Sequence, residues 1–250
     1  MQNPFIWHDL MTPDVAAAKK FYGAVVGWTF TEQMPAYTVA NVEGDKGMGG
    51  IMATPPELGS MKPFWSGYVY MPDVDAACAK IKKLGGVIHR EPWDVVGILR
   101  MAVVGDPTGG NFNIMQPVSD GRGSFPASTT LGAVGWNELH AGDFNAAWEF
   151  YAGMFGWTKG NAMDMGAMGV YQIFQIEGRD VGGMMKRQDP LPSPMWLYYF
   201  NVDGIDAAAA RVTKAGGKIT MGPHQVPGDL WIVSGVDPQG AIFNLLSSTK

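Results

Sequence analysis

The chain has 250 residues, of which 46% are hydrophobic and 16% charged, and its formal net charge is −5. This length suits two domains that each bury a core of their own. The negative charge argues against the basic surface that nucleic-acid binding needs, and no apolar run reaches the roughly 20 residues of a membrane span. We therefore expect a globular protein with neither nucleic acid nor membrane as its partner.

The N-terminal residues and the cysteine content favour the cytoplasm. The chain begins without the basic stretch and apolar core of a signal peptide. Cys78 is the only cysteine, which excludes an intrachain disulfide and a zinc site built from cysteines. Cys78 lies in an alanine-rich helical stretch, where we interpret it as buried packing rather than as a reactive thiol.

The first half of the sequence predicts two modules, each with a strand, a helix and further strands. The first module opens with a strand over 5–11, after which Asp14 caps a helix that ends at Gly27. Its remaining predicted strands cover 37–43 and 49–53. The second module has a strand over 65–71, a helix from Pro72-Asp73 to Gly85-Gly86, and strands over 87–90, 99–104 and 111–115.

The second half follows the same plan. It predicts strands over 134–140, 170–177, 181–186 and 195–202, helices over 144–154 and 205–215, and three closing strands. The fold class is therefore α+β, with four βαβββ units. One helix covers only one face of a small sheet, so pairs of units would face each other across sheet-lined clefts.

The two halves also share their residues. Trp7, Asp14 and Phe21-Tyr22 recur 129 residues later as Trp136, Asp143 and Phe150-Tyr151. A repeat of this length indicates a duplicated domain, because solenoid repeats have periods of roughly 20–50 residues. We predict a first domain over 1–118, a linker over 119–131 and a second domain over 132–250.

Three signatures, each present in both halves, carry a family resemblance. They are Asp14…Phe21-Tyr22…Gly27-Trp28, the helix Asp75-Ala-Ala…Gly85-Gly86, and the turn Asp106-Pro-Thr-Gly109 before Phe112-Asn113. Together they resemble the vicinal oxygen chelate superfamily, which includes glyoxalase I, bleomycin-resistance proteins and extradiol dioxygenases. The length resembles its two-domain, glyoxalase-like group related to a mycobacterial antigen. The resemblance implies tandem glyoxalase-like domains.

In metal-using members of that superfamily, ligands come from the first strand, the strand that opens the second unit, and the last strand. By alignment on the signatures, these positions carry Trp7, Ser66 and Asn113 in one half and Trp136, Leu197 and Asn244 in the other. His8 neighbours the first position but faces the opposite side of its strand. Since divalent metals prefer His nitrogen and carboxylate oxygen, we predict no metal and no cofactor.

Strand alternation predicts which side chains line the clefts instead. In the first domain they are Trp7, Asp9, Met11, Ser66, Tyr68, Tyr70 and Asn113; in the second they are Trp136, Glu138, His140, Tyr199, Asn201 and Asn244. Glu138 and His140 are two residues apart on one strand face, about 7 Å between Cα atoms, and His exchanges protons near neutrality. They are the candidate catalytic pair, although a buried structural acid beside a rim imidazole also fits.

The leading hypothesis is a cytoplasmic protein that binds a small, partly aromatic molecule in an apolar cleft without metal. One alternative is a metal-dependent glyoxalase or dioxygenase that uses His8, Glu138 and His140. Another is a metal-free lyase, isomerase or hydroxylase that uses Glu138 and His140. Because a fused duplicate can complete its sites internally, we expect a monomer or a loose homodimer.

Overall fold

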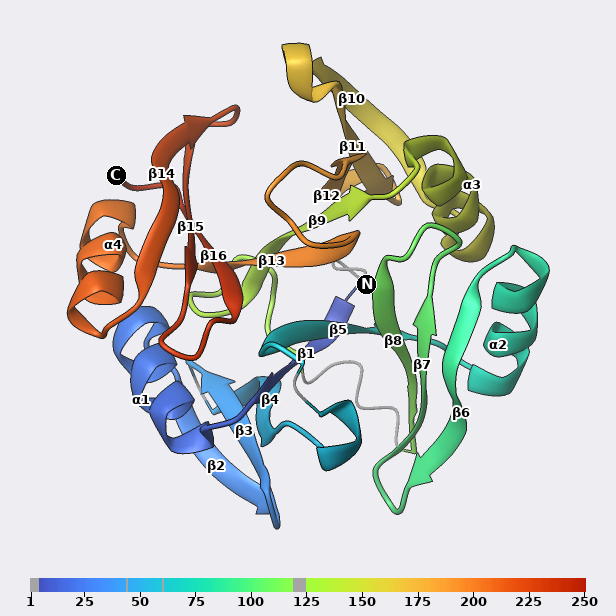
Figure 1. The fold of residues 1–250 in the computed structure, drawn as a ribbon, viewed down its shortest axis with the longest axis horizontal. Helices are drawn as coiled ribbons and strands as arrows, with labels where there is room; N and C mark the ends of the chain where they lie inside the picture. Colours follow the sequence, from blue (N-terminus) through green and yellow to red (C-terminus); the bar gives the residue numbers. More distant parts are fainter. Residues whose placement is uncertain (1–4, 44, 60, 119–124) are drawn as a thin grey trace. The chain divides into compact units, whose positions relative to one another are not determined.

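A computed structural model describes residues 5–43, 45–59, 61–118 and 125–250, which form four successive βαβββ modules (Figure 1). The first repeat contains β1 (Phe5–Thr12), α1 (Val15–Val26), β2 (Thr29–Met34), β3 (Tyr37–Val42), β4 (Lys46–Ala53), β5 (Phe64–Tyr70), α2 (Val74–Lys83), β6 (Val87–Val95), β7 (Leu99–Gly105) and β8 (Asn111–Pro117). The second contains β9 (Val134–Ala141), α3 (Phe144–Phe155), β10 (Thr158–Asp164), β11 (Val170–Ile176), β12 (Arg179–Lys186), β13 (Met195–Asn201), α4 (Ile205–Lys214), β14 (Lys218–Val226), β15 (Leu230–Val236) and β16 (Ile242–Ser247). The predicted α+β class and the four βαβββ units are confirmed.

The strands form two sheets of eight with the same topology. Their orders are β2-β3-β4-β1-β5-β8-β7-β6 and β10-β11-β12-β9-β13-β16-β15-β14. The first and last strands of each module pair in parallel, as β1 does with β4, and the second, third and fourth strands of each module pair antiparallel. The duplication therefore extends from the sequence to the order of the strands.

The sequence pattern missed β2 and β10, the corresponding edge strands of the two sheets. Nearly every side chain of β2 is exposed, and β10 is exposed along most of its length. A strand without a buried face shows no apolar alternation, so period-two reading cannot detect it. The backbone pairing with β3 and β11 defines these strands.

The first helix of each repeat begins and ends as the sequence predicts. The Asp14 carboxylate accepts a hydrogen bond from the Ala17 N–H at 2.9 Å, which caps α1. Gly27 ends the helix with φ of 89°, a left-handed conformation that glycine adopts without steric cost. Asp143 and Gly156 play the same parts in α3.

The chain packs as two compact units, and each unit takes one module from each repeat. Among the described residues, unit 1 comprises 5–6, 66–118 and 137–196, and unit 2 comprises 7–43, 45–59, 61–65, 125–136 and 197–250. In unit 2, α1 lies beside α4, and Arg211 donates to the Val25 carbonyl at 3.1 Å (Figure 1). In unit 1, Lys80 of α2 donates to the Met154 carbonyl of α3 at 2.9 Å.

A tyrosine from one repeat and an aspartate from the other hold each unit together. In unit 2, Tyr22 donates to Asp237 Oδ2 at 3.1 Å and accepts from Trp65 Nε1 at 3.0 Å. Burial raises the pKa of Tyr22 well above its usual range, and the Asp237 carboxylate raises it further. Trp28 stacks on the Tyr22 ring at 5.3 Å, which explains the repeated Gly-Trp signature.

Unit 1 repeats this arrangement with exchanged partners. Tyr151 donates to Asp106 Oδ2 at 3.1 Å, accepts from Trp196 Nε1 at 2.9 Å, and stacks with Trp157 at 5.1 Å. The second carboxylate oxygen of Asp106 accepts the Gly110 N–H, which closes the Asp-Pro turn. The three family signatures therefore meet in the core of each unit, across the two repeats.

The described part of the predicted linker packs on unit 2. The Asn201 amide donates to the carbonyls of Ser128 and Thr130, and Gly132, the residue that follows the linker, accepts from the Trp28 indole at 2.9 Å. Residues 119–124, the first part of that linker, lie outside the described residues.

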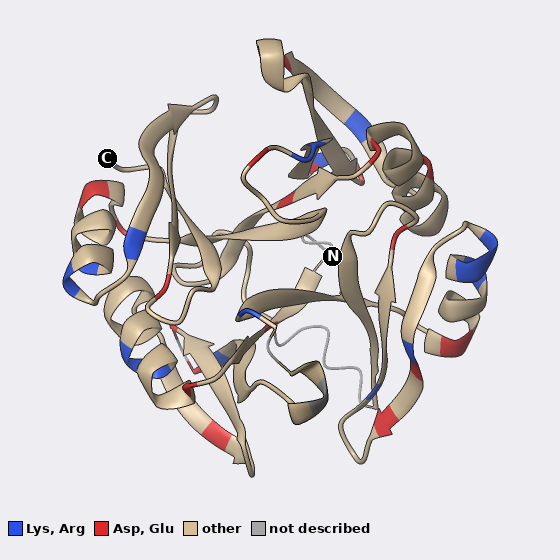
Figure 2. Ribbon diagram, in the orientation of Figure 1, with Lys and Arg blue, Asp and Glu red and all other residues tan. Residues whose placement is uncertain are grey.

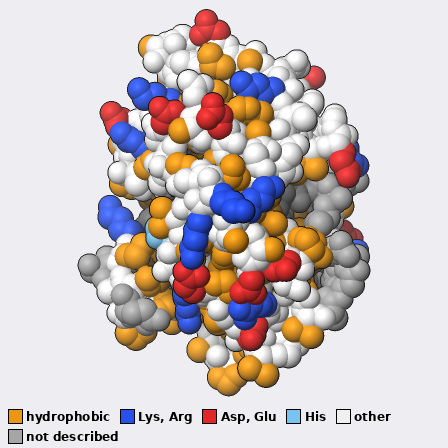
Figure 3. All heavy atoms as spheres, turned by 90° about the vertical axis from the view of Figure 1, so that its right-hand side faces the viewer, with side chains coloured by type: hydrophobic (Ala, Val, Ile, Leu, Met, Phe, Trp, Pro, Cys, Tyr) orange, Lys and Arg blue, Asp and Glu red, His pale blue; other side chains and the backbone are white. Residues whose placement is uncertain are grey.

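Charged residues lie mainly on the helices and on strands toward the sheet edges (Figure 2). On the face drawn in Figure 3, acidic and basic groups are mixed among hydrophobic atoms rather than gathered by sign. No helix within the described ranges is long and apolar enough to cross a membrane. Cys78 is buried and unpaired, and burial raises the pKa of its thiol, which disfavours the reactive thiolate.

Candidate functional site

The first strand of each repeat carries one buried or nearly buried carboxylate. In unit 2, Asp9 Oδ1 accepts hydrogen bonds from Tyr37 OH at 2.7 Å and from Trp7 Nε1 at 2.9 Å. Trp7 Nε1 also lies 2.8 Å from Tyr37 OH, which closes the cluster. Burial raises the pKa of Tyr37 far above its usual range, with a further rise from the Asp9 carboxylate. The neutral phenol is therefore a fixed donor to Asp9.

The matching cluster of the second repeat lies in unit 1 and includes an imidazole. Glu138 Oε1 is 2.9 Å from His140 Nε2, and Glu138 Oε2 accepts from Tyr171 OH at 2.9 Å. His140 is 7% exposed, and its Nδ1 has no hydrogen-bond partner among the described residues. A carboxylate that orients an imidazole, whose second nitrogen is not engaged, is an arrangement able to move a proton.

Two repeated glycines make room for the tyrosines. A Cβ added at Gly50 would overlap Tyr37, and one added at Gly183 would overlap the Tyr171 ring. Gly50 and Gly183 are also the register partners of Asp9 and Glu138, respectively. The Gly-Gly pair on β4 and β12 therefore allows each tyrosine to reach across the strand to the carboxylate.

The sequence reasoning did not identify Tyr37 and Tyr171 as site residues. These tyrosines lie on β3 and β11, which carry none of the predicted ligand positions. A signal was present, because each tyrosine lies near the start of the strand that pairs with the repeated Gly-Gly segment, two residues before the residue that pairs with Gly50 or Gly183. A tyrosine diagonal to such a glycine, next to a buried acid, predicts a phenol–carboxylate hydrogen bond.

The asparagines at the last ligand position differ between the repeats. In unit 1, Asn113 Nδ2 donates to Ser66 Oγ at 2.7 Å. In unit 2, Asn244 is 1% exposed, and neither its Nδ2 nor its Oδ1 has a partner among the described residues. The residue at the position of Ser66 is Leu197, which offers no hydrogen bond.

The other predicted cleft residues lie on the expected strands. Tyr68 and Tyr199 are buried and are the register partners of Asn113 and Asn244, and Tyr70 pairs with Met115. Met11 and Trp136 are partly exposed. Asn201 is engaged with the backbone of 128–130 rather than with another predicted site residue. His8 packs its ring against Tyr198 at 4.7 Å in unit 2.

The donor groups do not suit a divalent metal. The predicted ligand positions supply indole, hydroxyl, leucine and amide side chains, and the adjacent carboxylates are engaged by phenol, indole or imidazole donors. Within the part of the chain that the structure describes, no three His, Cys, Asp or Glu side chains gather closely enough to hold a metal ion. No chemical step is therefore assigned to a metal.

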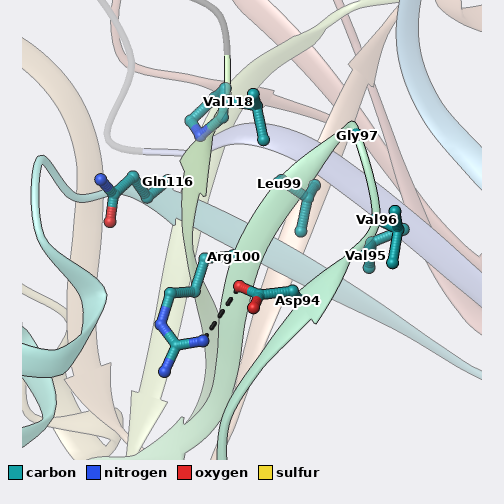
Figure 4. A pocket seen from close by; sticks show the side chains of 9 residues that line it. Asp94, Val95, Val96, Gly97, Leu99, Arg100, Gln116 and Val118 are labelled. Carbon is teal, nitrogen blue, oxygen red and sulfur yellow. Dashed lines mark hydrogen bonds and ion pairs between the residues drawn. The ribbon is translucent and has the colours of Figure 1, made fainter.

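A shallow hollow of about 400 Å³ lies elsewhere, at the β6–β7 hairpin of unit 1 (Figure 4). Arg100 contacts Asp94 at 2.9 Å there and binds Asp75 through two further hydrogen bonds. Val96 on its rim is 92% exposed. The Arg100 charge at this hollow is engaged by two carboxylates, and the hollow contains none of the predicted site residues.

Comparisons with known proteins identify the family of the chain. The profile of the Glyoxalase/Bleomycin resistance protein/Dioxygenase superfamily matches residues 5–114 and 133–245. CFP32 of Mycobacterium bovis, a protein provisionally named a glyoxylase, is 34% identical over 248 residues, covering 96% of this chain and 93% of CFP32. The anthracycline biosynthesis protein DauV of Streptomyces sp. is 29% identical over 272 residues, covering 96% and 91%.

Solved structures share the fold at low sequence identity. The Mn(II)-bound glyoxalase from Novosphingobium aromaticivorans has a TM-score of 0.69 at 15% identity, with 100% of this chain and 83% of that chain covered. The 2,2′,3-trihydroxybiphenyl 1,2-dioxygenase from Sphingomonas wittichii has a TM-score of 0.70 at 11% identity, with 98% and 90% covered. With both repeats matched by the family profile, the chain belongs to the Glyoxalase/Bleomycin resistance protein/Dioxygenase superfamily.

Proposed function

We propose that this protein binds a small, partly aromatic molecule in an apolar cleft and does so without a metal. The observation that carries the proposal is the engagement of the carboxylates near the ancestral ligand positions. Asp9 is held by Trp7 and Tyr37, and Glu138 by His140 and Tyr171. To coordinate a metal, either carboxylate would have to give up these hydrogen bonds, and its neighbours offer no replacement ligand set.

The aromatic character of the ligand follows from the predicted lining and from relatives. Trp7, Tyr68, Tyr70, Trp136 and Tyr199 give flat apolar surfaces on the strands that face the predicted clefts. Two relatives are named for the biosynthesis of anthracyclines, which are fused-ring aromatic compounds. A flat ring system that stacks on indole and phenol side chains suits such a lining.

Metal analysis tests the metal-independent part of the proposal. The purified protein should contain well under one transition metal ion per chain by inductively coupled plasma mass spectrometry. A chelator should leave its melting temperature unchanged, because a structural or catalytic ion would stabilise the folded state by binding it. A stoichiometric ion lost together with stability would establish the metal-dependent alternative instead.

A second function is favoured by the Glu138–His140 pair, which has the geometry of a general base with an orienting carboxylate. This candidate is a metal-free lyase, isomerase or hydroxylase. The isomerisation of methylglyoxal hemithioacetals, assayed with chelator present, is a direct test. His140→Gln and Glu138→Gln should each lower such activity by about 10²–10⁴-fold, whereas His224→Gln, at an exposed strand position, should not.

Assembly and location are proposed on the same basis. Each unit already contains modules from both repeats, so a monomer or a loose homodimer is sufficient to complete the sites. Light scattering that found an obligate tetramer would contradict this. A reducing cytoplasm suits the buried, unpaired Cys78, and cell fractionation tests that placement.

A further inference from the structure

We infer that Asn244 binds the polar end of the ligand. The second repeat, rather than the first, then forms the hydrogen bonds that recognise the ligand's polar groups. The inference rests on the proposed function, which supplies a ligand but does not say which repeat recognises it or by which group. Asn244 lies on β16 of unit 2, where it is the register partner of Tyr199 on β13.

The state of the Asn244 side chain is the first step. It is 1% exposed, and both of its amide atoms lack a hydrogen-bond partner among the described residues. Buried amides in folded proteins are nearly always hydrogen-bonded, because an unpaired buried donor or acceptor forfeits its hydration without compensation. A buried amide with both atoms unpaired therefore indicates an occupant that supplies a donor and an acceptor.

The first repeat provides an internal comparison. Its equivalent residue, Asn113, has the same side chain and is also buried, but it donates to Ser66 Oγ at 2.7 Å. The second repeat has Leu197 in place of Ser66, so the partner present in one repeat is missing from the other. The same fold thus satisfies one asparagine internally and leaves the other to an outside group.

The chemistry of the amide defines the ligand class. Asn presents a carbonyl acceptor and an NH₂ donor side by side and carries no charge. Its complement is an uncharged group with an adjoining donor and acceptor, such as a hydroxyl next to a carbonyl. Tyr199, the buried register partner of Asn244, adds an aromatic neighbour on the adjacent strand. We therefore assign the ligand as an aromatic hydroxy-carbonyl compound.

The first measurement is thermal melting without ligand, on the full chain. Asn244→Leu should raise the melting temperature by a few degrees, because leucine keeps the branched shape of the side chain and removes the two unpaired polar atoms. Asn113→Leu is the matched control and should lower it, because Ser66 loses its partner. If Asn244→Leu instead lowers the melting temperature as much as Asn113→Leu, the amide is satisfied inside the protein and the inference is wrong.

The second measurement compares the binding of dihydroxyanthraquinone with that of anthraquinone. Quenching of tryptophan fluorescence detects the binding of each probe. The wild type should bind the hydroxylated probe at least about tenfold more tightly, since a site that hydrogen-bonds a hydroxyl rejects the analogue without it. Asn244→Leu should remove that preference, and His224→Gln, at an exposed position of β14, should keep it. Leu197→Ser should weaken the preference too, because it gives Asn244 the hydroxyl partner found in the first repeat.

The outcomes separate the inference from the proposed function. Tight binding of both probes with no effect of Asn244→Leu would mean that a bound water satisfies the amide; the inference would fail while aromatic binding stood. Loss of the preference in Asn113→Leu alone would assign recognition to the first repeat and overturn the inference. Binding of neither probe by the wild type would overturn the ligand class and the aromatic part of the proposed function together.

Discussion

Each repeat places a carboxylate on its first strand, and the residues around the two carboxylates differ. Asp9 has a phenol and an indole as neighbours, whereas Glu138 has a phenol and an imidazole. The phenol–carboxylate pair is common to both and is made possible by Gly50 and Gly183. The second repeat therefore differs from the first at this position by His140, and on its last strand by the unpaired Asn244.

The buried phenol of Tyr37 predicts a loss of stability at alkaline pH. Its pKa is raised by burial and by Asp9, whereas in the unfolded chain it ionises near pH 10. When the pKa of a group is higher in the folded protein than in the unfolded chain, its protonated form stabilises the fold. That stabilisation is complete below the pKa of the unfolded chain and is lost as the pH rises from there through the pKa of the folded protein. In urea unfolding, the stability advantage of wild type over Tyr37→Phe should therefore shrink by up to about 1.4 kcal/mol per pH unit above about pH 10. A constant difference between about pH 8 and pH 11 would show that Tyr37 is not the group responsible.

Gly183 predicts the effect of a single added methyl group. In Gly183→Ala the new Cβ would overlap the Tyr171 ring, so the ring must leave Glu138. We expect a destabilisation of about 1–3 kcal/mol by overpacking, together with loss of the Tyr171–Glu138 hydrogen bond. Gly160→Ala is the control, because its Cβ would meet only the flexible ends of Gln175 and Asp180. Chemical denaturation of both variants measures the difference; equal stabilities would mean that Tyr171 has space to move.

At the scale of elements, burial decides what the sequence reveals. The pattern predicted the helices and most strands close to their observed bounds, since each has a buried face, as α1 does with Ala18, Tyr22 and Val25. The edge strands β2 and β10 were missed because they bury almost nothing. The alternation of β1 predicted which face of the strand carries Asp9. Tyr37 lies on another strand, and only the register of β3 against β4 brings its hydroxyl to the Asp9 carboxylate.

The contact between α3 and the Asp106 turn predicts a matched pair of mutants. Tyr151→Phe removes the hydroxyl that joins Asp106 to Trp196, leaving a buried acceptor and a buried donor unpaired. We expect a loss of about 1–3 kcal/mol in the free energy of unfolding. Tyr22→Phe should cost a similar amount, since it breaks the equivalent contacts to Asp237 and Trp65. Guanidinium unfolding would contradict the equivalence of the two units if only one variant were destabilised.

At the scale of the whole molecule, the repeat predicted the fold but not the composition of the packing units. The signatures recur in register, which is sufficient to identify tandem domains. They do not show that Tyr22 contacts Asp237 of the other repeat, because the sequence would allow the equivalent Asp106 as well. The choice between the two aspartates depends on which modules pack together, and that is a property of three-dimensional packing rather than of local pattern.

This exchange of modules predicts what happens when the repeats are separated. Residues 1–118 alone would lack the Asp237 partner of Tyr22 and the Phe200 and Phe243 rings packed around it. Residues 132–250 alone would lack the Asp106 partner of Tyr151 and the ring of Phe112. Each fragment would expose the apolar face of two modules, so we expect self-association or partial unfolding when either is expressed alone.

Mixing the fragments should restore a folded one-to-one complex, because each supplies the module that the other needs. Sedimentation and circular dichroism of the separate and mixed fragments provide the measurement, and the near-ultraviolet signal of the stacked tryptophans reports the native core. The complex should melt at a lower temperature than the intact chain. Two separate fragments lose translational and rotational entropy when they associate, whereas the covalent link spares the intact chain this cost. A first repeat that is monomeric and melts at the temperature of the whole protein would show that its core is complete without the second.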